Sequence, residues 1–284
     1  MALATALAVA PTVPVPANSP AAAVELFPTT VPTAVPIVRT IPVLNPVPDG
    51  ARAMDPTSKA EAATVWDLPA GSMVFNPVSG RHEVIDPSVA QQAVLFGDSQ
   101  SSGIRGMKGI DTWVEAGLAA RGYKVRFLGA PGTGYVASSP SGMNYLDAVS
   151  SGRVVLPYGK PALVVVQGGG NDAAQGVSDA QILANADGLL RELKASYPNS
   201  KFLFIGILSR GGASGGRRSQ VDTLLAGFAK GNGVNFLSPS DWLTRYGTAT
   251  TMIDGVHLTA SGHKGLSKVL ADQLAAMHFD GPAH

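Results

Sequence analysis

Five short apolar runs alternate with longer amphipathic segments from about residue 91 onward, and this alternation limits the folds open to the chain most strongly. The runs are AVLFG (93–97), KVRFLG (124–129), ALVVVQ (162–167), KFLFIGIL (201–208) and NFLS (235–238). Strands that are apolar throughout are buried on both faces, and the helices between them cross over to the next parallel strand. The pattern therefore predicts a three-layer α/β/α fold around a doubly wound parallel sheet.

The chain before this sheet has a different composition. Ten of the 21 prolines lie within residues 1–50, where they favour extended polyproline II and predict a disordered linker. Residues 51–90 contain two alternating stretches on either side of a glycine-containing turn, which predict a small accessory lead-in with a β-hairpin. We assign residues 91–278 to the main α/β domain and residues 279–284 to a C-terminal tail.

The first ten residues, MALATALAVA, fit either the remnant of a secretory signal or a plain apolar tail. A cleavage region could follow at residues 15–17, but no basic residue precedes Arg39. Prolines interrupt the apolar run well before the ~20 residues that a membrane-spanning helix needs. We therefore expect no membrane span, and the signal reading predicts a secreted or cell-envelope protein.

Composition excludes several kinds of site. The chain has no cysteine, which removes disulfides, thiolate metal sites and cysteine nucleophiles. Its formal net charge is +1 and charged residues make up 14%, so nucleic acid is not an expected partner. The hydrophobic share of 45% is ample for a buried core, and the function has to be sought in a local site.

Loops beyond the carboxyl ends of the strands are the places where doubly wound sheets bind ligands. The loop after the first run reads Gly97-Asp98-Ser99, and a serine at a tight strand-to-helix turn can expose its hydroxyl. The glycines of residues 129–135 allow backbone N–H groups to approach a ligand oxygen. Taken singly, the serine is better interpreted as a helix cap and the second loop as a turn.

Two later loops carry the remaining polar candidates. In residues 168–172 the amide of Asn171 could donate to an oxyanion or form an ordinary Asx-turn, and Asp172 could cap the next helix. In the last loop, Asp254 and His257 are three residues apart, so one turn can supply an imidazole base and the carboxylate that orients it. A histidine that merely packs at a helix start is the alternative for His257.

The four loops together resemble the SGNH hydrolase family, also called GDSL esterases and lipases. The resemblance covers about residues 91–278 and rests on Gly-Asp-Ser (97–99), a glycine after the second strand, Gly-x-Asn-Asp (169–172) and Asp-x-x-His (254–257). It implies a flavodoxin-like three-layer fold and no metal or organic cofactor. Gln100 stands where the leucine of the GDSL motif would be, a departure that we expect to affect packing more than chemistry.

The same resemblance implies the roles of individual residues. Ser99 would be the nucleophile, His257 the general base and then acid, and Asp254 the carboxylate that orients the imidazole. An oxyanion hole would be formed by the Ser99 N–H, a glycine N–H of the second loop and the Asn171 side chain. Gly132 is our choice for that glycine because it follows the proline of the loop, and Gly134 is the competitor.

Two other patterns compete with this interpretation. Residues 212–216 (GASGG) fit the G-x-S-x-G elbow of α/β-hydrolases, but Ser214 lies several residues beyond the end of the fourth run. We interpret residues 210–219 as a flexible loop whose arginines, Arg210, Arg217 and Arg218, are solvated or, alternatively, meet an anionic or sugar-rich substrate. His263 has no further ligands at metal-binding spacing, and no metal site is expected.

We therefore expect a serine esterase that hydrolyses carboxylic esters through an acyl-serine intermediate. Its substrate would be a small-molecule, lipid or acylated carbohydrate ester, with short-chain acyl groups in first place. An O-acyltransferase with the same triad is an alternative, and so is a noncatalytic surface module that binds carbohydrate. The motif itself does not separate hydrolysis from acyl transfer.

Overall fold

The computed structural model describes residues 64–282, so the predicted signal remnant, the proline-rich linker and residues 283–284 lie outside the described part of the chain. A parallel sheet of five strands lies at its centre in the order β4-β3-β5-β6-β7. The strands are β3 (Gln92–Phe96), β4 (Lys124–Phe127), β5 (Leu163–Gln167), β6 (Lys201–Ile205) and β7 (Asn235–Leu237). This is the flavodoxin-like order 2-1-3-4-5, and the predicted fold class is confirmed.

Alternate residues of the apolar strands enter two separate cores. Within β3, Val94 and Phe96 belong to one hydrophobic cluster and Ala93 and Leu95 to the other. Each is fully buried, because successive side chains of a strand point to opposite faces and both faces are covered. The continuous apolar runs thus have their physical cause in helices that pack on both sides of the sheet.

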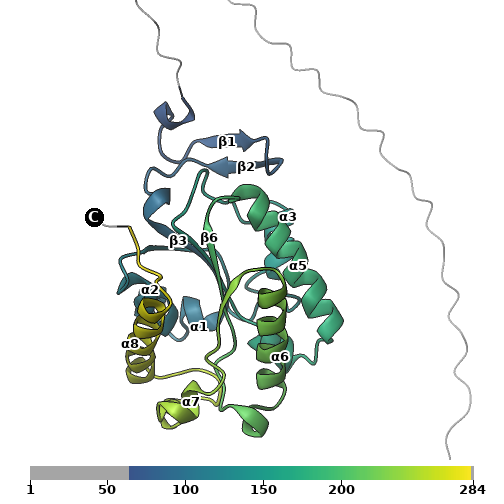
Figure 1. Cartoon of the computed structure of the whole chain (residues 1–284), viewed down its shortest axis with the longest axis vertical. Helices are drawn as coiled ribbons and strands as arrows, with labels where there is room; N and C mark the ends of the chain where they lie inside the picture. Colours follow the sequence, from purple (N-terminus) through teal and green to yellow (C-terminus); the bar gives the residue numbers. More distant parts are fainter. Residues whose placement is uncertain (1–63, 283–284) are drawn as a thin grey trace, which may run out of the picture. The chain divides into compact units, whose positions relative to one another are not determined.

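The helices form the two outer layers. They are α1 (Ser99–Ser102), α2 (Trp113–Ala119), α3 (Tyr145–Ser150), α4 (Gly170–Ala174), α5 (Asp179–Ser196), α6 (Gly212–Gly231), α7 (Trp242–Arg245) and α8 (Ala260–Ala276), with 3-10 turns η1 (Val65–Asp67), η2 (Val89–Gln91), η3 (Gly109–Asp111) and η4 (Thr248–Thr251). Figure 1 shows α2 and α8 on one side of the sheet and α3, α5 and α6 on the other. None of the helices within residues 64–282 is long and apolar enough to cross a bilayer.

A small antiparallel hairpin precedes the sheet, formed by β1 (Met73–Asn76) and β2 (Arg81–Val84). The carboxylate of Glu83 is buried there and accepts hydrogen bonds from the Asn76 amide at 2.9 Å and the Ser79 hydroxyl at 2.8 Å. Arg81 pairs with Glu192 of α5, and Val84 forms a bridge with Pro157, so the hairpin is attached to the main domain.

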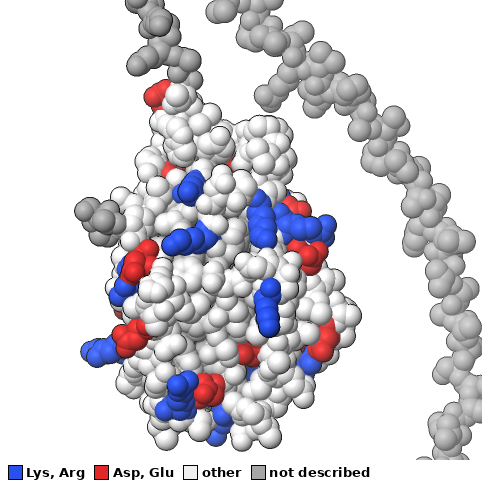
Figure 2. Space-filling model, viewed as in Figure 1, with Lys and Arg blue, Asp and Glu red and all other residues white. Residues whose placement is uncertain are grey.

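The segment after β6 differs from its sequence interpretation. Residues 212–231 form α6, so most of the predicted flexible loop is helical, with one non-helical residue, Gly216, at a kink. Glycine at this position permits the positive φ of 53° that the kink requires. Figure 2 shows acidic and basic side chains interspersed on the pictured face, without a large field of one sign.

Candidate active site

Ser99 lies at the point where β3 passes into α1, at the carboxyl edge of the sheet and next to β5. The turn is tight: a Cβ at Gly97 would meet the Ser101 side chain, and a Cβ at Gly129 would clash with the Gly97 carbonyl. Asp98 caps α1 by accepting a hydrogen bond from the Gln100 N–H at 2.8 Å. These contacts fix Ser99 as the first residue of the helix, with 8% of its surface exposed.

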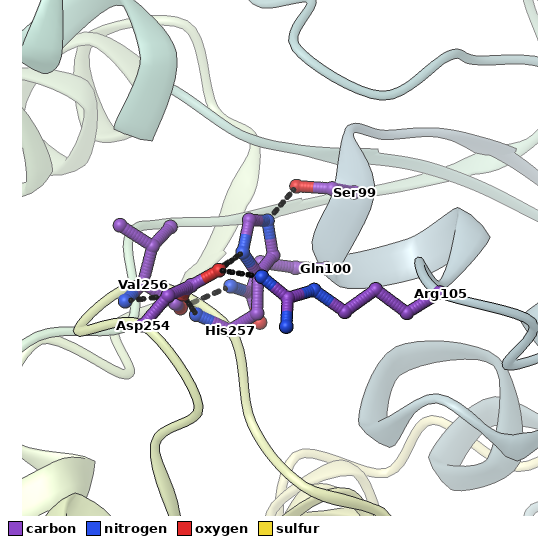
Figure 3. A network of polar contacts seen from close by, with 6 residues as sticks. All are labelled: Ser99, Gln100, Arg105, Asp254, Val256 and His257. Atoms are coloured by element: carbon purple, nitrogen blue, oxygen red, sulfur yellow. Dashed lines mark hydrogen bonds and ion pairs between the residues drawn. The ribbon is translucent and has the colours of Figure 1, made fainter.

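The side chains of Ser99, His257 and Asp254 form one chain of hydrogen bonds (Figure 3). Ser99 Oγ lies 2.9 Å from His257 Nε2, and His257 Nδ1 lies 2.9 Å from Asp254 Oδ2 and 3.1 Å from Oδ1. An ionised carboxylate can only accept, so Nδ1–H donates to Asp254 and Nε2 is free to accept from the serine. This is the arrangement that a serine nucleophile needs for activation.

Asp254 is held as a carboxylate by hydrogen bonds within its own loop. The bond from the His257 ring keeps the pKa of Asp254 well below its usual range, and the backbone N–H groups of His257 and Val256 lower it further. The loop is closed by a hydrogen bond from the Ile253 N–H to the His257 carbonyl at 2.7 Å. Arg105 approaches Asp254 at 3.7 Å from the exposed side (Figure 3).

The two glycines of the second loop differ in what their N–H groups do. The Gly134 N–H donates to the Ala137 carbonyl at 2.9 Å and is therefore occupied. The Gly132 N–H has no acceptor within residues 64–282, and Gly132 adopts a left-handed φ of 78°. The described contacts thus leave Gly132, and not Gly134, available as an oxyanion donor.

Asn171 joins the second and third loops. Its amide Nδ2 donates to the Thr133 carbonyl at 2.8 Å and lies 3.4 Å from Asp98 Oδ2. Burial raises the pKa of Asp98 to about 6, although the Gln100 N–H and the positive charge of Arg218 lower it. Ser99, Asn171 and Arg218 line one hollow at the sheet edge, which brings Asn171 to the nucleophile.

Asp172 has a role that sequence reasoning missed. It does not act as a helix cap, because its carboxylate accepts hydrogen bonds from three backbone N–H groups of the second loop: Tyr135 at 2.9 Å, and Val136 and Ala137 at 2.8 Å. A Cβ at Gly134 would clash with this carboxylate, which gives that glycine a structural role. The second loop is therefore fastened to α4, beside Asn171.

Gln100 is more than a packing residue, contrary to the expectation from sequence. Its side chain is 7% exposed, donates from Nε2 to the Val256 carbonyl at 2.8 Å and accepts at Oε1 from Trp113 Nε1 at 3.1 Å. A leucine at this position would fill similar space but would make neither hydrogen bond.

The other residues singled out in the sequence, Ser214, the arginines of the α6 segment and His263, are not members of the triad. Ser214 is within the first turn of α6 and not at the end of a strand, so it lacks the geometry of a nucleophile elbow. Arg217 pairs with Asp179 at 2.6 Å, whereas Arg218 lines the hollow beside Ser99. His263 is buried, its Nδ1 accepts from the Trp113 N–H at 3.0 Å, and burial lowers its pKa to about 4.

No group of three or more metal-ligating side chains, among His, Cys, Asp and Glu, gathers within the described residues. The hollow beside Ser99 is very small, about 10 Å³, and its lining includes Ile207 and Leu208 from the segment after β6. Ligand pockets commonly span ~300–1,000 Å³, so the enclosed space at the nucleophile is far smaller than a typical ligand pocket.

Comparisons with known proteins identify the family of the chain. Residues 95–264 match the GDSL-like Lipase/Acylhydrolase family. Esterase TesA of Pseudomonas aeruginosa is 33% identical over 126 residues, which are 42% of this chain and 56% of that protein. The chain thus spans little more than half the length of this relative.

Solved structures share the fold at low sequence identity. A family two carbohydrate esterase from Clostridium thermocellum superposes with a TM-score of 0.54 at 12% identity, covering 70% of this chain and 68% of that one. A member of the lipolytic protein G-D-S-L family from Veillonella parvula gives 0.51 at 16% identity, covering 65% and 98%. A crystal structure of TesA gives 0.50 at 22% identity, covering 66% and 99%.

Proposed function

Because the chain belongs to the GDSL-like lipase/acylhydrolase family, we propose that it is a carboxylic ester hydrolase with Ser99 as its nucleophile. The observation that carries this proposal is the continuous hydrogen-bond chain from Ser99 through His257 to Asp254. The three side chains come from two loops 155 residues apart in sequence, and both loops lie at the carboxyl edge of the sheet.

In the proposed first half-reaction, the acyl group is transferred to Ser99, and His257 starts as the tautomer with its proton on Nδ1. As Ser99 Oγ attacks the ester carbonyl, its proton passes to His257 Nε2, and Asp254 stabilises the imidazolium that forms. The carbonyl oxygen becomes an oxyanion, for which the Ser99 N–H, the Gly132 N–H and the Asn171 amide are the proposed donors. Asn171 would use the N–H that otherwise makes only a long bond of 3.4 Å to Asp98 Oδ2, since its other N–H is held by the Thr133 carbonyl. The imidazolium then protonates the leaving alcohol, and an acyl-serine ester remains.

Deacylation repeats these steps with water. His257 takes a proton from the water molecule, whose oxygen attacks the acyl-serine, and returns the proton to Ser99 Oγ as the carboxylic acid leaves. Each oxyanion donor typically contributes ~3 kcal/mol of transition-state stabilisation, so Asn171 and Gly132 would carry a large share of the rate.

A short acyl group fits the proposed site best. The hollow beside Ser99 is only about 10 Å³ and part of its wall is polar, with Asn171 and Arg218 among the lining residues. An acetyl group needs little space beyond the carbonyl, whereas a long acyl chain needs an apolar channel. Carbohydrate esterases occur among the structural neighbours, and acetylated sugars are therefore the first alcohol class to test.

The proposal is tested by hydrolysis of p-nitrophenyl acetate by the wild type, Ser99→Ala and Ser214→Ala. Ser214 is the matched control because it is the other serine in a glycine-rich motif. We expect Ser99→Ala to lose essentially all turnover and Ser214→Ala to retain it. Equal rates in the wild type and Ser99→Ala would overturn the proposal.

Substrate class is tested with a series of p-nitrophenyl esters of rising chain length beside acetylated mono- and oligosaccharides. We expect kcat/KM to be highest for acetyl or propionyl esters and to fall from butyryl onward. A maximum at eight carbons or more would contradict the inference from the small hollow.

A further inference from the structure

The side chain of Gln100 links the nucleophile helix to the histidine loop. Gln100 directly follows Ser99 in α1, and its amide Nε2 donates to the Val256 carbonyl, which precedes His257 (Figure 3). The bond joins residues 156 positions apart in the sequence, at 2.8 Å. Both partners therefore lie one residue from a triad member.

The orientation of the amide is fixed at its other end. Oε1 accepts a hydrogen bond from the indole Nε1 of Trp113, a fully buried residue of α2. The backbone N–H of Trp113 in turn donates to Nδ1 of His263 in α8. A flipped amide would set its N–H2 against the indole N–H and its oxygen against the Val256 carbonyl. Only one orientation satisfies both partners, so the donor is held toward the loop.

Apart from Leu258, which is buried in the core, the loop that carries His257 is held mainly by contacts within itself, such as the bridge of Met252 with Leu258. Ile253 and Asp254 are exposed, and the hydrogen bonds of Asp254 are made to Val256 and His257 of the same loop. Arg105, which meets Asp254 at 3.7 Å, has a side chain that is 64% exposed, and such ion pairs contribute little. The bond from Gln100 is partly buried and joins two uncharged groups, so it does not depend on the charge of either partner.

From these contacts we infer that Gln100 is a positioning residue, which sets the distance between Ser99 Oγ and His257 Nε2 by holding the Val256 carbonyl. The inference rests on the proposed function of the triad. A displacement of about 1 Å can cost roughly a hundredfold in rate, so the loss of one of several restraints is expected to cost about tenfold. The GDSL leucine cannot make this bond, so the restraint depends on the glutamine of this chain.

The test compares Gln100→Leu with Ser101→Ala. Ser101 is the matched control, since it is also buried in α1 and its hydroxyl makes one hydrogen bond, to Gln167 Oε1 at 2.7 Å, that does not reach the histidine loop, while the Asp98 cap that places Ser99 is untouched. Rates on p-nitrophenyl acetate are divided by the number of sites labelled by a fluorophosphonate, so that unfolded protein does not count. We expect kcat per labelled site to fall about tenfold in Gln100→Leu with KM within about twofold, and Ser101→Ala to stay within about twofold of the wild type.

Gln100→Glu gives a second readout that a purely structural role would not move. A neutral Glu can donate its O–H to the Val256 carbonyl and accept from Trp113, whereas the ionised form opposes that carbonyl. The ratio of mutant to wild-type kcat per labelled site is therefore expected to rise several-fold between pH 8 and pH 5.

The outcomes separate this inference from the proposed function. A wild type without Ser99-dependent turnover overturns both. If the wild type is active but Gln100→Leu has the same kcat per labelled site, the positioning role alone is overturned. The same holds if Ser101→Ala loses as much kcat as Gln100→Leu. Should Gln100→Leu fail to fold, the pH ratio of Gln100→Glu decides, and a flat ratio refutes the inference.

Discussion

Replacing Asp172 by Asn removes one of the three hydrogen bonds that fasten the second loop to α4. The new amide retains the most contacts when its oxygen takes the place of Oδ1, which accepts from Val136 and Ala137. Its nitrogen then replaces Oδ2 and faces the Tyr135 N–H, two donors that cannot pair. The size and shape of the side chain are almost unchanged, so the perturbation is electrostatic.

The expected loss follows from the one bond that breaks. A hydrogen bond to a charged group contributes about 1.5–3 kcal/mol, and the unpaired N–H of Tyr135 is buried, so we expect the free energy of unfolding to fall by roughly 2–3 kcal/mol. In a domain of 150–250 residues, 1 kcal/mol shifts Tm by about 2–4 °C. The Tm of Asp172→Asn should therefore lie roughly 4–12 °C below that of the wild type.

The assay is thermal unfolding followed by circular dichroism, with Asp187→Asn as the control. Asp187 undergoes the same chemical change on the surface of α5, where it pairs with Arg191 at 3.1 Å, and exposed pairs contribute ~0–1 kcal/mol. We also expect kcat to fall several-fold in Asp172→Asn, because Gly132 belongs to the loosened loop. A Tm within 2 °C of the wild type would refute the role assigned to this carboxylate.

Three further predictions concern charged groups. Asp98→Asn should raise the free energy of unfolding at pH 8 by up to about 3 kcal/mol, because the native pKa of about 6 lies above the ~3.9 of an unfolded chain. Because the native state binds the proton of Asp98 more tightly than the unfolded chain does, the stability difference between Asp98→Asn and the wild type should vanish near pH 4 in urea unfolding. A difference that stays constant with pH contradicts this prediction. Asp254→Asn should lower kcat by about 10⁴-fold with only a small fall in Tm, since the imidazole loses its orienting carboxylate and the group is exposed; less than a tenfold loss in steady-state kinetics refutes this. Arg105→Ala should leave kcat within about twofold, because the exposed pair with Asp254 contributes little; a tenfold change would show a direct role.

The fold was predictable because the three central strands, β3, β5 and β6, are buried on both faces. Runs such as residues 163–167 have no polar alternation to obscure them, and their spacing leaves room for one helix between strands. The carboxyl ends of parallel strands meet at one edge, so the four loops could be expected to converge before any distance was known. The roles of Ser99, Asp254 and His257 needed in addition the resemblance of the four loops to the SGNH hydrolase family, because each loop alone has another interpretation.

The supporting contacts could not be predicted, since they join residues that no local pattern connects. Asp172 reaches back 35–37 positions to the second loop, and a single aspartate after an asparagine is equally compatible with a helix cap. Gln100 reaches forward 156 positions to a backbone carbonyl, and a main-chain acceptor leaves no mark in the sequence. The helical start of α6 was missed for a related reason, because its glycines normally disfavour a helix.

The exposed placement of the Asp254–His257 loop affects how this protein can lose its activity. Ser99 and Asp172 are buried, whereas Ile253 and Asp254 are exposed and belong to neither hydrophobic core. A substitution at Asp254 would therefore remove activity while the cores stay intact. Inactive variants of this kind would remain folded, and a screen based on expression alone would not detect them.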